Sequence, residues 1–149
     1  MTISVRPVAS TDREAWQELF WAYLDFYEAE PNAHSTDLVW SRLNADKPEI
    51  HGLVAELDGR IVGITHFHFQ MSTWSDTRLC YLEDLYVDNQ VRGRGVASTL
   101  IQAVKAAAIE QGSTELFWIT KSDNETARRI YDKVASLTDY VRYEIPLER

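Results

Sequence analysis

Apolar residues recur at two different periods along the chain, and the change of period predicts an alternation of strands and helices. Residues 2–8 are rich in β-branched side chains, which favours a first strand with Pro7 at its edge. Over residues 12–28 the apolar side chains recur every three or four positions, which predicts a helix, and Thr11 with Glu14 has the form of a capping box. The chain therefore begins with a strand and an aromatic-rich helix.

A short second helix and a hairpin are predicted next. Ser35 or Thr36 can cap the helix, and residues 51–57 and 61–70 then have the composition of two strands. An Asp-Gly pair separates these two runs and tolerates the positive φ of a tight turn, so we expect a β-hairpin.

The second half of the chain predicts a βαβ unit and a closing segment. A strand over residues 81–87 leads through a glycine-rich loop into a helix that begins at Val96 or Ala97, and residues 115–121 return as a strand. The usual right-handed crossover makes these two strands parallel. Further predictions are a helix over 125–135 capped by Asn124, and one or two final strands over 137–147.

His66 and His68 occupy one face of the second hairpin strand, and this spacing can present two metal ligands. No third and fourth ligand follows at a suitable spacing. The alternative is a pair of partly exposed strand histidines, and we therefore expect no metal.

Composition narrows the classes of function. The length of 149 residues predicts a single domain over 1–149. The net charge of −8 argues against non-specific nucleic-acid binding and suits polyamines, other amines and basic peptides as partners. No segment resembles a signal peptide or a membrane span, so we expect a cytoplasmic protein without a membrane partner. The single cysteine, Cys80, excludes an intrachain disulfide.

The loop Arg92-Gly93-Arg94-Gly95 has the character of an anion-binding site. Glycines allow a tight turn with backbone N–H groups that point at a ligand, and the following helix adds its positive end. Two arginines add charge that suits a phosphate. The loop lacks the lysine and spacing of a nucleoside-triphosphate loop, so a diphosphate-bearing cofactor is the first hypothesis.

The order of motifs over about residues 79–143 resembles the GNAT superfamily of N-acetyltransferases. The string from Gln90 to Ala97 is similar to the Q/R-x-x-G-x-G/A loop of that family, and ELFWIT and then N-x-x-A-x-x-x-Y, ending at Tyr131, follow at the expected distances. Within the superfamily the chain is most similar to the branch of diamine acetyltransferases and small histone- or amino-acid-acetylating enzymes. One departure is Val134-Ala135, where many relatives carry a glycine-phenylalanine turn.

The resemblance implies an α/β (α+β) three-layer fold. Its central sheet would be mostly antiparallel, splayed at one parallel pair, and flanked by about four helices. Acetyl-CoA would lie in the gap, with no metal. The residues implied for acetyl-CoA binding are Leu85, Tyr86, Val87, Arg92, Gly93, Arg94, Gly95, Val96, Ala97, Ser98, Asn124 and Ala127.

Acetyl transfer to an amine needs a base for the ammonium and a proton for the thiolate that leaves. Glu83 is the candidate base, or else a carboxylate that merely binds the cationic acceptor, and strand alternation predicts that Asp84 points to the opposite face. Tyr131 is the candidate acid, or else a packed core tyrosine. Tyr27 and Glu28, with Glu83, are the candidate substrate-binding residues.

The sequence thus predicts an acetyl-CoA-dependent N-acetyltransferase. Its acceptor would be a primary amine of a polyamine, amino acid or basic peptide, and the amine would attack directly in a ternary complex. The alternative is a catalytically silent acyl-CoA sensor. A homodimer is a further expectation.

Overall fold

The computed structural model describes residues 2–148, and the chain divides into two compact units at Ile119/Thr120. The first unit contains a five-stranded sheet and three α-helices, and the second contains one further helix, so each unit is described by itself. That the chain forms a single domain stays a prediction.

The sheet of the first unit runs in the order β1-β2-β3-β4-β5, and every neighbouring pair is antiparallel except β4 with β5, which is parallel. The mixed sheet with one parallel pair is thereby confirmed. Asp58 and Gly59 take φ values of 52° and 79° in the β2–β3 turn, as the Asp-Gly signal predicted. The strands are β1 (Ile3–Pro7), β2 (His51–Leu57), β3 (Arg60–Met71), β4 (Arg78–Val87) and β5 (Leu116–Phe117).

The parallel pair is short. Cys80 pairs with Leu116 and Tyr81 with Phe117, after which β4 continues to Val87 without β5 beside it. The predicted strand over residues 115–121 is therefore reduced to two residues. The sheet is splayed at the parallel pair, as expected.

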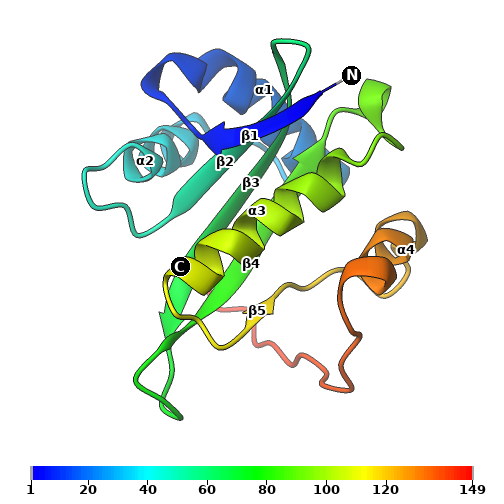
Figure 1. Cartoon of the computed structure of the whole chain (residues 1–149). Coiled ribbons are helices and arrows are strands. Elements are labelled where there is room, and N and C mark those ends of the chain that lie inside the picture. The colour runs from blue at the N-terminus through cyan, green and yellow to red at the C-terminus, as the bar shows by residue number, and fades with distance from the viewer. Residues whose placement is uncertain (1, 149) are drawn as a thin grey trace. The chain divides into compact units, whose positions relative to one another are not determined.

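Helices cover both faces of this sheet, which gives three layers (Figure 1). One face carries α1 (Arg13–Phe26) and α2 (Ala33–Leu43), and its core includes Trp16, Leu43 and Ile64. The other face carries α3 (Val96–Glu110), whose Val96 and Leu100 pack on Val62 and Val87. Short 3₁₀ turns, Ser10–Asp12 and Asn89–Val91, precede α1 and α3.

The start of α1 differs from the predicted capping box of Thr11 and Glu14. The helix has Asp12 as its N-cap, without a side-chain cap hydrogen bond. The buried Asp12 carboxylate instead pairs with Arg6 at 2.8 Å and accepts from the N–H of Ala9 at 2.7 Å. Arg6 holds the pKa of Asp12 below its usual value, so this ion pair joins β1 to the helix start.

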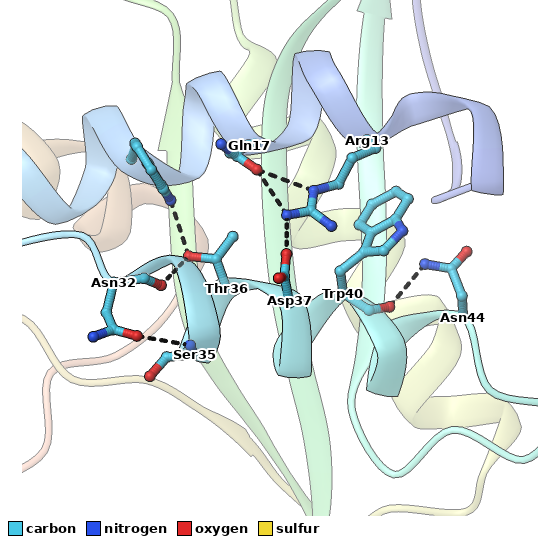
Figure 2. A network of polar contacts seen from close by, with 9 residues as sticks. Arg13, Gln17, Asn32, Ser35, Thr36, Asp37, Trp40 and Asn44 are labelled. Atoms are coloured by element: carbon cyan, nitrogen blue, oxygen red, sulfur yellow. Dashed lines mark hydrogen bonds and ion pairs between the residues drawn. The ribbon is translucent and has the colours of Figure 1, made fainter.

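Polar contacts fasten α2 to α1 (Figure 2). Asn32, and neither Ser35 nor Thr36, caps α2 by accepting from the N–H of Ser35 at 2.9 Å, which corrects the predicted cap. Thr36 is buried and accepts from the indole N–H of Trp21 at 3.0 Å. Trp21 of α1 therefore faces α2.

The second unit contains α4 (Glu125–Val134), which begins at Asn124 as predicted. The expected strands over residues 137–147 are absent from the described part of the chain: residues 135–148 take neither helix nor strand. A strand needs a neighbouring strand for its N–H and C=O groups, and the second unit offers none among its described residues. Tyr140, Tyr143 and Leu147 are accordingly exposed.

Candidate active site

A β-bulge shapes the middle of β4. His66 of β3 pairs with Asp84, and the next residue, Phe67, pairs with Leu82, so Glu83 is an extra residue in β4. The hydroxyl of Thr65 donates to the carbonyl of Asp84 at 2.7 Å beside this irregularity.

The bulge turns two adjacent carboxylates to the same side of the sheet. His66 and His68 are two residues apart in β3 and share a face, and they contact Asp84 and Glu83 respectively. The prediction that Asp84 points to the face opposite Glu83 is therefore wrong, because the extra residue interrupts the alternation. Cys80, which pairs with Phe69, lies on the other face from Glu83.

Each carboxylate has its own histidine. Glu83, about half exposed, accepts from Nε2 of His68 at 3.0 Å. The more enclosed Asp84 accepts from Nδ1 of His66 at 2.8 Å, and Nε2 of His66 accepts from the indole N–H of Trp16 at 2.9 Å. His68 is partly exposed, as expected, whereas the sequence pattern missed the burial of His66, which α1 covers.

Aromatic side chains of α1 face these carboxylates. Burial, the charge of Asp84 and a hydrogen bond to Asp84 raise the pKa of Tyr23, and Tyr27 and Glu83 add to the rise. The ring of Tyr23 meets Tyr27 at 5.1 Å and Tyr86 at 6.4 Å between centroids. The predicted substrate residues Tyr27 and Glu83 thus share one neighbour, Tyr23.

Glu28 lies immediately after the last turn of α1. It is exposed, its φ of 57° is in the left-handed region, and its N–H donates to the carbonyl of Asp25 at 2.9 Å. No contact of the Glu28 side chain with Glu83 accompanies this position among the described hydrogen bonds and ion pairs, so its role in substrate binding stays a prediction.

The glycine loop ends at an uncapped helix. Gly93 and Gly95 both have φ of 83°, and a Cβ at either would meet no protein atom within 4 Å. Gly95 is the N-cap of α3, with no side-chain cap and no acidic residue in the first turn. The backbone N–H groups of Val96, Ala97 and Ser98 start the helix there, so the open loop and positive helix end fit a pyrophosphate.

The other residues predicted for the cofactor lie around this loop. Arg92 donates from Nε to the carbonyl of Val87 at 3.2 Å, and its guanidinium lies 5.5 Å from the ring centroid of Tyr86. Arg94 is exposed. Leu85 and Val87 pack toward the core beneath α3, whereas Tyr86 packs on the α1 side. The contact with Val87 thus ties Arg92 to β4.

The second unit carries the remaining predicted residues. Asn124 caps α4 by accepting from the N–H of Ala127 at 3.4 Å and donates to the hydroxyl of Thr120 at 3.2 Å. Ala127 and Tyr131 are half-buried on the same stripe of α4. The amide of Asn124 therefore fixes the helix start, and contact of these residues with a cofactor stays a prediction.

Asp84, His66 and Tyr23 are the site residues that the sequence patterns missed. The paired histidines followed by Glu83-Asp84 in the next strand were a signal, but alternation assigned Asp84 to the wrong face. Among residues 2–148, no three His, Cys, Asp or Glu side chains are grouped to hold a metal ion. None of the described helices is long and apolar enough to cross a membrane.

Comparison with known proteins places the chain in a family. Residues 14–135 match the Acetyltransferase (GNAT) family. The D-amino-acid N-acetyltransferase HPA3 of Saccharomyces cerevisiae is 29% identical over 144 residues, which cover 95% of this chain and 89% of that protein. The thialysine N-epsilon-acetyltransferase of Caenorhabditis elegans is 32% identical over 100 residues, or 67% of this chain and 59% of that protein.

A solved structure agrees with this assignment. The crystal structure of a probable acetyltransferase superposes with a TM-score of 0.85 at 25% identity, covering 100% of this chain and 99% of the other. The predicted fold class and the enzyme class are thereby confirmed. The chain belongs to the GNAT family of acetyltransferases.

Proposed function

We propose that this protein transfers the acetyl group of acetyl-CoA to a primary amine of a small cationic molecule or a basic peptide. The small acceptors that we propose are polyamines and amino acids. The observation that carries the proposal is the continuity of β4 with the glycine loop. One segment presents Glu83 beside the tyrosines of α1 and then leads to the open N-terminus of α3. An amine site and a phosphate site are thus joined by one strand and its loop.

Each predicted site residue has a role in the proposed reaction. Gly93, Gly95 and the first N–H groups of α3 bind the pyrophosphate of acetyl-CoA, which supplies the acetyl group as a thioester. Glu83 accepts the proton that the acceptor ammonium must lose, directly or through a water, while His68 orients its carboxylate. Tyr131 gives its phenolic proton to the sulfur that leaves.

The names of the relatives narrow the acceptors worth testing. The yeast relative is named for D-amino acids and the nematode relative for the ε-amine of thialysine. Both names describe amines of amino acids, which supports the amino-acid branch of the proposal. The acceptor panel should therefore contain D- and L-amino acids, lysine analogues with a side-chain amine, polyamines and a lysine peptide.

The test measures thiol release from acetyl-CoA with that panel. We expect turnover with at least one amine. Glu83→Gln and Tyr131→Phe should each lower kcat by roughly 100-fold while the Kd for acetyl-CoA stays the same, because each removes a proton-transfer group. Glu110→Gln, at the exposed end of α3, is the matched control and should keep full activity.

Other outcomes are equally informative. Tight acetyl-CoA binding with no turnover across the whole panel would contradict the enzyme proposal and favour the acyl-CoA sensor. Full activity in Glu83→Gln would leave Glu83 as an acceptor-binding group at most. The cytoplasmic location and the homodimer remain predictions, and light scattering on the purified protein tests the second.

A further inference from the structure

We propose that Asp84 is a second acceptor-binding carboxylate of this site, and that Trp16 and His66 are positioning residues that hold it. This inference rests on the proposed function, because it names a substrate-binding group of the same acetyltransferase site.

The first step is the asymmetry between the two carboxylates that the bulge places on one face. Glu83 has a side chain that is 51% exposed, and the side chain of Asp84 is 15% exposed. Glu83 contacts the partly exposed His68, whereas Asp84 contacts the buried His66. The more exposed carboxylate suits proton transfer with solvent, and the enclosed one suits a fixed contact.

The second step is the tautomer of His66. The indole N–H of Trp16 can only donate, so Nε2 of His66 must be the unprotonated acceptor. Nδ1 then carries the ring proton and donates to Oδ2 of Asp84. With the other tautomer, two N–H donors would face each other and a lone pair would face the carboxylate. The contact with Trp16 and the contact with Asp84 are therefore both made by the neutral His66 ring that carries its proton on Nδ1.

The third step is the capacity of Asp84 to bind a further donor. Its two oxygens offer about four lone-pair sites, and the described donors are the N–H of His66 and the hydroxyl of Tyr23. Tyr23, which interacts with Asp84, also packs against Tyr86 at 6.4 Å between ring centroids, and such aromatic rings can attract a cation. An acceptor ammonium that donates to Asp84 would be held next to Glu83, which takes its proton.

Other titratable groups also face this chain of contacts. They come from three strands and from the helix that covers them: Glu83 of β4, His68 of β3, His51 of β2 through its interaction with His68, Tyr23 and Tyr27 of α1, and Arg13 of α1, whose guanidinium lies 5.9 Å from the Trp16 ring centroid.

A test that does not depend on turnover reads the tautomer of His66. Long-range ¹H–¹⁵N correlations of the histidine rings should show the neutral His66 ring protonated at Nδ1 and bare at Nε2. The exposed His34 serves as the internal reference for an imidazole in contact with solvent. An Nε2–H tautomer of His66 would contradict the positioning role.

The kinetic test uses three variants. Asp84→Asn should raise the KM for the amine about 10- to 100-fold, since a charge-assisted contact is lost, and should leave the KM for acetyl-CoA unchanged. Trp16→Phe should raise the amine KM about fivefold and let the His66 ring take up its Nε2–H tautomer, because Nε2 then has no indole N–H to accept from. Trp40→Phe changes the ring that packs 4.9 Å from Trp16 and should do neither.

The outcomes separate this inference from the function on which it rests. Turnover with an unchanged amine KM in Asp84→Asn overturns the inference and leaves the acetyltransferase proposal standing. Equal effects of Trp16→Phe and Trp40→Phe would show that Trp16 acts through packing alone, and would overturn its positioning role. Absence of turnover with every amine overturns both proposals.

Discussion

Cys80 shows how a single residue limits the mechanism. It is the one cysteine of the chain and is fully buried at the start of the parallel pair, on the face opposite Glu83. Burial raises the pKa of its thiol to about 11, so the thiolate needed for nucleophilic attack is scarce at neutral pH. A covalent acetyl-cysteine intermediate is therefore disfavoured relative to direct attack by the amine.

We expect Cys80→Ala to keep the kcat of the wild type and to lower the free energy of unfolding by about 1 kcal/mol, the cost of a small buried cavity. The folded-state pKa lies above the ordinary value of 9.0, so this thiol stabilises the fold below about pH 9 and the stabilisation is lost as pH rises toward 11. Denaturant titrations at pH 7 and pH 10 should show a larger loss for the wild type than for Cys80→Ala. An inactive but folded variant would contradict direct attack.

Residue-level prediction from the sequence succeeded where the chemical type of a side chain was sufficient. It failed where the direction or burial of a side chain depends on how distant segments pair and pack. Glu83 could be named as the candidate base from the proton transfer that acetylation of an amine requires. The direction of the Asp84 side chain could not be predicted, because a bulge depends on two paired strands and cannot be recognised from the sequence of one of them. The buried environment of His66 likewise depends on α1, which crosses β3 far away in sequence.

At the scale of elements, short-range signals predicted structure well and long-range pairing did not. The Asp-Gly hairpin, α3 and the Asn124 cap each depend on a few adjacent residues, and all three are observed. The strands expected over residues 137–147 depend on a partner far along the chain, and apolar alternation says nothing of which edge is available. The Asp12 contact with Arg6 replaced the expected capping box for the same reason.

The element that best allows a matched test is the loop before α3. We expect Gly95→Ala to raise the Kd for acetyl-CoA at least about tenfold, because a methyl group enters the open space where the loop meets the pyrophosphate. A left-handed alanine also costs about 1 kcal/mol of stability. Gly112→Ala is the control, because Gly112 has φ of 76° and equally open surroundings at the other end of α3.

Titration calorimetry and thermal unfolding of both variants separate binding from strain. Both variants should lose similar stability, and only Gly95→Ala should lose affinity. Equal affinities in two folded variants would contradict the assignment of this loop to the pyrophosphate.

At the scale of the whole molecule, the net charge of −8 affects how strongly the protein attracts an acceptor from solution. An acidic protein attracts cations over a distance set by the Debye length, about 10 Å at 0.1 M salt and about 3 Å at 1 M. The charge of the chain thus favours cationic amines before any specific contact forms.

We expect kcat/KM for a diamine to fall several-fold between about 20 mM and 500 mM salt, because screening weakens this attraction. A monoamine of the same chain length is the control and should show a smaller decrease, since it carries half the charge. Steady-state rates at saturating acetyl-CoA measure both. Equal salt dependence of the two amines would show that the overall charge does not steer the acceptor.

The β4 bulge also has a consequence for how sequences of this family diverge. Because adjacent positions 83 and 84 face the same side, an acidic residue can move from one to the other during evolution without leaving the α1 side of the sheet. In a regular strand the same one-position change would carry the group through the sheet. Alignments that match acidic residues column by column can therefore pair groups of different function. In this strand, relatives should therefore be aligned by the position of the bulge in the backbone.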